Sequence, residues 1–282
     1  MDGFLLINKE KGWTSFDVCK RISHILGTKK VGHSGTLDPF ATGLMIVAVN
    51  KATKALLYSN YSYKTYTATL KLGIKTKTGD LTSEEVERKP VPELTKEIVE
   101  SVLNSFVGDS EQIPPMTSAV HHNGVKLYKL AQQGLEVERK PRKICIKYIK
   151  LLSFSEDEIS FQCLVSSGTY VRVLGEDIAN KLNTVGHLTS LNRIAFGEEE
   201  KITLESAIKI DDVDESKIQP ILNYIDLDKV TVNEETKNKA IYGQNLKFDA
   251  KSDKILLVND NEPIAVYVKE DDGLYHCERG LW

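Results

Sequence analysis

The spacing of hydrophobic residues changes along the first fifty positions. Phe4 to Ile7 is a short apolar run that predicts a strand. After a polar turn and a helix cap at Thr14-Ser15, apolar residues recur at helical spacing until Gly27. Met45 to Val49 is a continuous apolar run, which is typical of a strand buried on both faces.

The remainder of the chain alternates between strand and helix patterns. Strands are predicted at 63–73, 144–154, 159–165, 254–258 and 263–268, and helices at 52–58, 93–106, 174–182 and 234–242. From about residue 221 the pattern changes to that of a small α+β module. We find no internal repeat and no low-complexity tract.

Charge is divided unequally along these 282 residues. The net charge is −3, but residues 1–80 hold 12 Lys/Arg against 5 Asp/Glu, whereas residues 197–282 hold 11 against 20. A surface for an anionic partner is therefore expected on the first part of the chain, with a merely solvated lysine-rich face as the alternative. The four cysteines show no zinc or disulfide spacing. With no signal-peptide pattern and no membrane-length apolar run, the expected location is the cytoplasm, with no membrane partner.

Asp38 lies in a loop with little conformational freedom. The loop, residues 32–44, precedes the buried strand pattern and contains glycines that permit backbone angles other residues resist. Pro39 disfavours the helical region for Asp38. An isolated Asp-Pro pair is most often a turn whose aspartate bonds its own backbone, so the surrounding sequence has to decide between a turn and a site.

The sequence GHSGTLDPFATGL at 32–44 resembles the active-site loop of the TruB family of tRNA pseudouridine-55 synthases, and further ordered segments extend the resemblance to about residue 197. The resemblance implies the pseudouridine synthase fold, which is α+β with a mixed or antiparallel central sheet flanked by helices, followed by a small C-terminal PUA-like domain. We expect a catalytic domain over 1–210 and a PUA-like RNA-binding domain over 221–282.

The family's motifs imply roles for five residues. Asp38 matches the catalytic nucleophile, and Lys-x-Tyr gives Tyr66 as the tyrosine that stacks on the target uracil. Tyr66 is also expected to be catalytic, by assisting removal of the C5 proton. SxGTYxR gives Tyr170 in the pocket and Arg172 as the partner of the catalytic aspartate, and HLxxLxR gives Leu191 beside the base. Without the family match, an ordinary strand tyrosine is favoured for Tyr66, and a core role for Leu191 is equally open.

Two further candidates lie near these motifs, and Asp80 is the weaker of them. Asp80 ends a T-x-T-x-D segment typical of the family. His33 stands on the Asp38 loop and is expected to bind substrate by stacking within the opened RNA loop, with acid-base chemistry as the lesser alternative.

A second family segment, from Gln112 to Gly134, departs from the usual pattern. Met116, Thr117 and His121 replace the family's more common residues, which leaves open any RNA contact at those places. Lys140 and Lys143 follow in a compact basic cluster that suits phosphates and carries no sequence specificity by itself.

The resemblance implies isomerisation of uridine 55 in the TΨC loop of tRNA to pseudouridine. This reaction breaks and remakes a glycosidic bond without consuming energy or electrons, so we expect no cofactor and no metal. Asp38 could attack C1′ of the ribose, attack C6 of the base, or deprotonate the sugar, and each step needs the ionised carboxylate. A bidentate Arg172 favours that form.

The expected partner is the TΨC arm of tRNA, bound by a monomer that needs no protein partner. Two other hypotheses remain. One is an RNA-binding or tRNA-folding protein whose chemistry is incidental. The other is a paralogue that acts on another RNA within a guided complex, which the absence of long basic tails disfavours.

Overall fold

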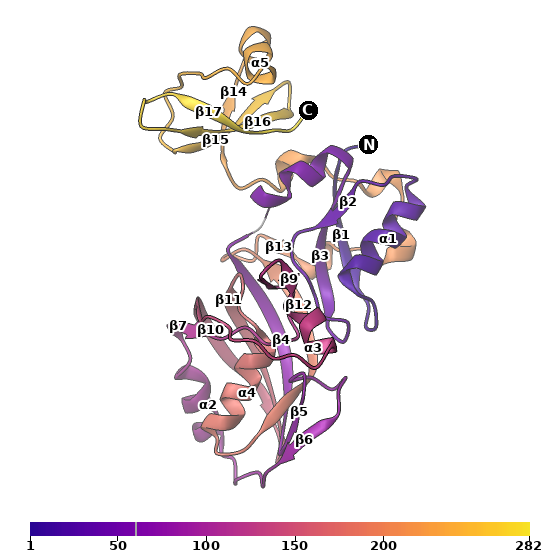
Figure 1. Ribbon diagram of the computed structural model, residues 1–282, viewed down its shortest axis with the longest axis vertical. Coiled ribbons are helices and arrows are strands. Elements are labelled where there is room, and N and C mark those ends of the chain that lie inside the picture. The colour runs from indigo at the N-terminus through magenta and orange to yellow at the C-terminus, as the bar shows by residue number, and fades with distance from the viewer. Residues whose placement is uncertain (60) are drawn as a thin grey trace. The chain divides into compact units, whose positions relative to one another are not determined.

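The computed structural model describes residues 1–59 and 61–282 (Figure 1). The chain forms two compact units, and each is described by itself. The first contains residues 1–39, 44–61 and 205–282, and the second contains residues 40–43 and 62–204. Among the described residues, no helix is both long and apolar enough to cross a membrane.

The first unit begins with a small sheet and one amphipathic helix. Its elements are strand β1 (Gly3–Lys9), helix α1 (Ser15–Ile25), strand β2 (Val31–His33), strand β3 (Thr42–Val49) and a 3-10 helix (Asn50–Tyr58). β3 lies beside β1 and pairs antiparallel with β2. Thr14 caps α1: it accepts a hydrogen bond from the Asp17 amide, and Asp17 accepts one from the Thr14 amide. The helix start therefore follows from local sequence, as predicted.

Residues after 205 cover the free edge of β1. Phe4 and Gln219 exchange backbone hydrogen bonds of 2.9 and 2.8 Å, and the Asn8 amide donates to the carbonyl of Ile208 at 2.8 Å. The Phe4 ring lies 5.1 Å from that of Tyr224. This segment contains the 3-10 turns Leu204–Ser206, Ile210–Asp212, Glu215–Lys217 and Ile221–Asn223. It protects an edge strand from pairing with other chains.

The chain ends in a separate four-stranded sheet with its own core. The strands run in the order β14 (Asp228–Thr231), β15 (Lys254–Asn259), β16 (Glu262–Lys269) and β17 (Tyr275–Gly280), with helix α5 (Glu234–Ile241) against them. The Tyr267 and Tyr275 rings are buried in this core, and both hydroxyls donate to backbone carbonyls. This sheet confirms the α+β module expected at the C-terminus and is consistent with a PUA-like fold.

The second unit is built on a larger sheet. Its strands follow the order β12 (Gly186–Phe196), β4 (Tyr63–Leu72), β11 (Glu158–Ser166), β10 (Arg142–Phe154) and β7 (Gly108–Gln112), and β13 (Ile202–Thr203) pairs with β12. Helices α2 (Lys96–Asn104) and α4 (Val171–Lys181) contact each other and pack on this sheet (Figure 1).

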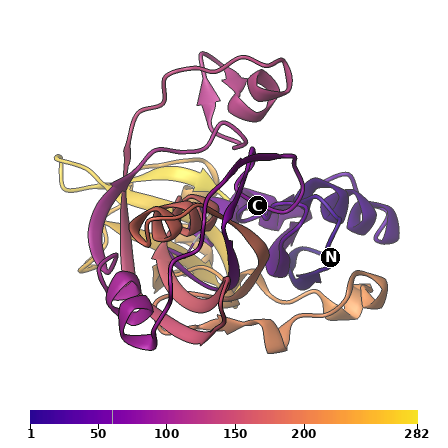
Figure 2. The same cartoon turned by 90° about the horizontal axis from the view of Figure 1, so that it is seen from below.

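Two small hairpins leave that sheet. One pairs β5 (Ile74–Thr76) with β6 (Glu85–Arg88), and the other pairs β8 (His121–His122) with β9 (Val125–Lys126), which leads into helix α3 (Leu127–Gln132). Figure 2 shows β8, β9 and α3, in magenta, standing away from the sheet of this unit.

The sheet of the second unit is mixed, which confirms the predicted fold class. Thr42 and Gly43, at the start of β3, pair parallel with Asn192 and Arg193, whereas the neighbouring β4 runs antiparallel to β12. A Cβ atom at Gly43 would lie 2.3 Å from the Arg193 carbonyl oxygen, so only glycine permits this approach.

Candidate active site

The backbone before Asp38 is fastened to the start of α1. The Ser15 hydroxyl donates to the Leu37 carbonyl at 3.1 Å and accepts from the Leu37 amide at 2.8 Å. Ser15 and Leu37 are both buried. The residue next to Asp38 is therefore fixed at both of its backbone groups.

The backbone after Asp38 is fastened as well. The Pro39 carbonyl accepts a hydrogen bond of 2.7 Å from the Gly12 amide and one of 3.4 Å from Lys9 Nζ. Lys9, which is fully buried, also donates to the Trp13 carbonyl at 2.7 Å. The sequence identified the turn at 9–12 but not this role of Lys9, because a lysine in a polar turn is usually solvated.

Asp38 itself is partly buried, and so is His33 at the end of β2, where it pairs with Val47 of β3. The structure thus places both candidates of the first unit on one loop, which has a strand at each end. Such a loop holds a reacting group in position better than a free surface loop does.

Arg172 is the most strongly constrained side chain among the candidates of the second unit. It lies in the first turn of α4 and is only 3% exposed. Its Nη1 donates to the Thr78 carbonyl at 2.6 Å and to Thr117 Oγ1 at 2.8 Å, and its Nη2 donates to the Thr117 carbonyl at 3.0 Å. The guanidinium therefore has a single permitted orientation.

Asp80, a weaker candidate from the sequence, is a charged partner of Arg172. Its Oδ2 lies 3.7 Å from Arg172 Nη1, and both side chains are buried. Its Oδ1 accepts hydrogen bonds of 2.9 Å from the Thr78 hydroxyl and the Thr82 amide, and a further one from the Thr82 hydroxyl. These bonds orient the carboxylate so that its second oxygen faces the arginine, and they satisfy a charge that burial alone would disfavour.

Thr117 departs from the family's usual residue, yet its hydroxyl is one of the groups that hold Arg172. A serine or threonine at this position supplies the same acceptor, so the departure retains the contact. The sequence could not show this role because Thr117 and Arg172 are 55 residues apart.

Tyr170 is positioned by a buried amide. The Tyr170 amide donates to Gln112 Oε1 at 2.7 Å, and Gln112 Nε2 donates back to the Tyr170 carbonyl at 3.1 Å. This pair of bonds satisfies polar groups at the start of α4, which has no side-chain cap. It also fixes the backbone two residues before Arg172.

Tyr66 and Leu191 lie on neighbouring strands. Tyr66 of β4 is opposite Arg193 of β12, and Leu191 is opposite Ala68, so Tyr66 and Leu191 share a face of the sheet. Both are buried. The structure thus brings the stacking and packing candidates together on one rigid surface.

The predicted basic cluster is divided between two hollows. Lys140 lines a cavity of about 330 Å³ together with His121, His122, Glu138, Arg139 and Arg142. Lys143 lines a different one, of about 490 Å³, which also contains the acidic residues Asp109 and Glu111. Lys140 therefore lies in a more positive environment than Lys143 does.

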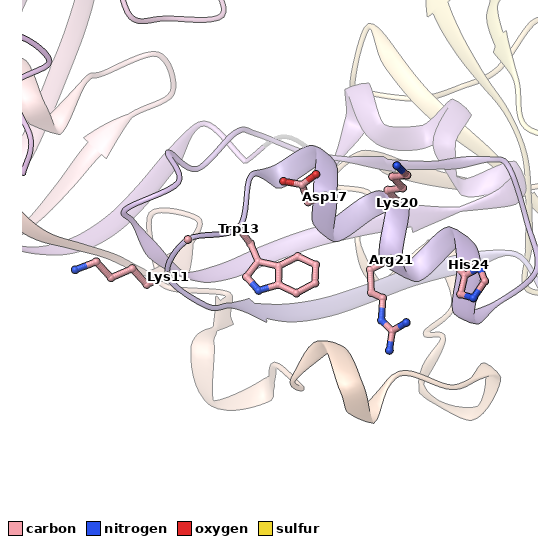
Figure 3. Close-up of a pocket in the computed structure, with 7 residues that line it drawn as sticks. Lys11, Trp13, Asp17, Lys20, Arg21 and His24 are labelled. Atoms are coloured by element: carbon pink, nitrogen blue, oxygen red, sulfur yellow. The ribbon is translucent and has the colours of Figure 1, made fainter. Parts of the chain in front are cut away.

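A further basic hollow runs along α1 (Figure 3). It has a volume of about 670 Å³ and is lined by the backbone of Gly12 and by Lys11, Trp13, Asp17, Lys20, Arg21 and His24. Arg21 is 3.7 Å from Asp211, and the other cationic side chains are exposed. Three basic side chains, Lys11, Lys20 and Arg21, thus lie at this hollow beside one carboxylate, Asp17.

Solved structures share this fold. The chain aligns over 99% of its length, and over 85% of the other chain, with a structure of a Cbf5-Nop10-Gar1 complex, at a TM-score of 0.74 and 22% identity. A structure of an H/ACA RNP bound to a substrate RNA containing 2′-deoxyuridine aligns over the same shares at a TM-score of 0.72 and 20% identity. The fold is that of the pseudouridine synthases.

Sequence comparison identifies the family. Residues 23–171 match the TruB family of pseudouridylate synthases (N terminal domain). The chain is 39% identical over 267 residues to a tRNA pseudouridine synthase B from Hydrogenovibrio crunogenus, which covers 93% of the chain and 86% of that protein. It is 36% identical over 288 residues to one from Dehalococcoides mccartyi, covering 98% and 95%. The chain belongs to the TruB family and is a pseudouridine synthase, an isomerase.

Proposed function

We propose that this protein is a cytoplasmic, monomeric tRNA pseudouridine synthase that converts uridine 55 in the TΨC loop to pseudouridine. The observation that carries the substrate assignment is the similarity to tRNA pseudouridine synthase B proteins, which extends over 93 and 98% of the chain in the two relatives compared above. A relationship over nearly the whole chain supports the assignment of the same class of substrate.

Asp38 is the proposed nucleophile. The bonds that fasten Leu37 and Pro39 restrict the carboxylate to a small region, which is what a reaction at one sugar or base atom needs. Attack at C1′, attack at C6 of the base and deprotonation of the sugar all use the ionised form.

Arg172 is proposed to keep that carboxylate ionised and oriented. Its contacts with Asp80 and Thr117 hold the guanidinium in place before substrate binds, so no reorganisation is needed during the reaction. Replacing it by lysine should remove most activity, because a point charge cannot reproduce the planar fork.

The target uridine is proposed to leave its stack and to rest against Tyr66, Leu191 and Tyr170. Extrusion of a base costs a few kcal/mol, which aromatic and apolar contacts offset. The basic hollows at α1 and beside Lys140 are proposed to bind phosphates of the tRNA, and His33 is proposed to stack within the opened loop.

Hydrogen release from C5 tests the proposal, because pseudouridine and uridine have the same mass. An unmodified tRNA transcript labelled with tritium at C5 of its uridines should release one equivalent of label, and sequencing should locate pseudouridine at position 55 alone. A transcript with cytidine at that position is the control and should release none. Release from another position, or no release from the uridine transcript, would refute the proposal.

A further inference from the structure

Lys64 is buried on the same strand face as Tyr66. The two residues are separated by one position in β4, so both side chains leave the same side of the sheet, roughly 7 Å apart. Lys64 is only 9% exposed. It is opposite Val165 on one neighbouring strand and Phe196 on the other.

A second cation lies close to it. Lys64 Nζ is 5.9 Å from the centroid of the Phe196 ring, and Arg193 Cζ is 4.6 Å from the same centroid. Arg193 is almost fully buried. The face of an aromatic ring attracts a cation, so Lys64 and Arg193 both lie against the Phe196 ring.

Within the described part of the chain, no carboxylate forms an ion pair with Lys64. Lys71, on the same strand, has such a partner: its Nζ lies 2.6 Å from Asp157 Oδ2. Burial, together with the nearby Arg193, lowers the pKa of Lys64 to about 7. A buried amine in this condition destabilises the folded chain, and a residue of that kind is commonly retained at a site that binds something.

We propose that Lys64 binds a backbone phosphate of the RNA beside the nucleotide that stacks on Tyr66. This inference rests on the proposed function and names the part of the substrate that the Lys64 face holds. A phosphate is the anion that RNA supplies at every nucleotide, so one lies next to any base that stacks on Tyr66.

A scan with uncharged phosphates tests the assignment. A TΨC stem-loop is made with a single methylphosphonate at each loop position in turn, and its affinity is measured for the full-length protein and for Lys64→Met, both carrying Asp38→Asn to prevent turnover. One methylphosphonate should weaken binding to the parent about tenfold, the loss expected for a charged hydrogen bond, and should change binding to Lys64→Met less than about twofold.

Controls separate this result from a structural role. Lys71→Met should respond to the scan as the parent does, Lys64→Arg should retain the sensitive position, and Lys64→Met should show a shallower dependence of affinity on salt, by about one ion. If Lys64 had only a structural role, Lys64→Met would respond to the methylphosphonate scan and to salt as the parent does. Lys64→Gln replaces Lys64→Met if the latter does not melt cooperatively.

The proposal is overturned if no loop phosphate is sensitive in the parent, or if the effects of Lys64→Met and of every methylphosphonate simply add. The protein with Asp38 intact decides separately about the proposed function. If it forms pseudouridine at position 55 while the scan shows no coupling, only the phosphate assignment fails. If it neither binds nor converts the tRNA, the proposed function fails.

Discussion

Replacing Lys64 by methionine should stabilise the folded protein at the same time as it weakens RNA binding. Methionine has a similar length and no charge, so it removes the burial cost of the ammonium and keeps most of the packing. The pKa of Lys64 falls from its ordinary 10.5 to about 7. One pKa unit corresponds to about 1.4 kcal/mol, so the ceiling on the gain is about 5 kcal/mol.

Relaxation around the amine reduces this ceiling, and we expect a gain in the free energy of unfolding of about 2 kcal/mol at pH 6. Proton binding to Lys64 decides whether the stability of the parent rises or falls with pH. Between about pH 7 and 10.5 the unfolded chain holds the proton on Lys64 more tightly than the folded chain does, so this group makes the parent more stable as pH rises. The burial cost is complete below pH 7 and disappears near pH 10.5.

Urea unfolding of parent and variant at pH 6 and pH 9 measures the effect. The stabilisation by Lys64→Met should be less than half as large at pH 9 as at pH 6. The cost of burying the ammonium decreases steadily between pH 7 and 10.5, and pH 9 lies past the middle of that interval. Lys71→Met, which removes a partly exposed ion pair with Asp157, should give no stabilisation at either pH. A Lys64→Met variant that is less stable than the parent at pH 6 would refute the reasoning.

Three further predictions concern catalysis and RNA binding. Asp38→Asn should abolish pseudouridine formation and leave tRNA affinity within about threefold, since it preserves shape but not nucleophilicity; substantial turnover would remove Asp38 from the nucleophile role. Thr117→Val should lower kcat about tenfold because Arg172 loses an acceptor, whereas Thr117→Ser should remain near the parent rate; equal rates for both variants would mean that this hydroxyl does not position Arg172. Lys140→Glu should weaken tRNA binding and reduce its salt dependence more than Lys143→Glu does, because Lys143 already has acidic neighbours; a larger effect at Lys143 would contradict that placement.

Local signals in the sequence were sufficient for many elements of the fold. The capping residues at Thr14 and Asp17, the continuous apolar run that forms most of β3, and the helical spacing in α4 each depend on neighbours within a few positions. The predicted α+β class with a C-terminal module is confirmed for the same reason, because it follows from the order of such elements and from the family motifs.

Strand β12 could not be assigned from local pattern. Its polar residues are too frequent for the usual strand pattern: His187, Thr189, Ser190, Asn192 and Arg193. Register shifts also interrupt the alternation of its two faces. It is a strand because β4 lies alongside it, with part of β3 on its other side. Pairing between strands so far apart in the sequence leaves no signal within either strand.

The candidate site also has a part that the sequence predicts and a part that it does not. The motifs located Asp38, Tyr66 and Arg172 by residue type, and their catalytic roles stay predictions. The groups that hold them, such as Ser15 at Leu37 and Thr117 at Arg172, come from distant segments and carry no distinctive pattern. Side chains that position a reacting group are therefore the part of a site that requires a structure.

The placement of β4 has a consequence for how the chain is made. Thr69 of β4 makes side-chain hydrogen bonds with Ser160, 91 residues later, and with Ser190, 121 residues later. During synthesis from the N-terminus, β4 is therefore made before β11 and β12, the two strands that pair with it. Until they follow, the hydrogen-bonding groups on both edges of β4 are unpaired. Open strand edges pair readily with other chains, and contacts between distant residues form slowly. We therefore expect a nascent chain that stalls before Phe196 to aggregate through the strand that bears the proposed RNA contacts.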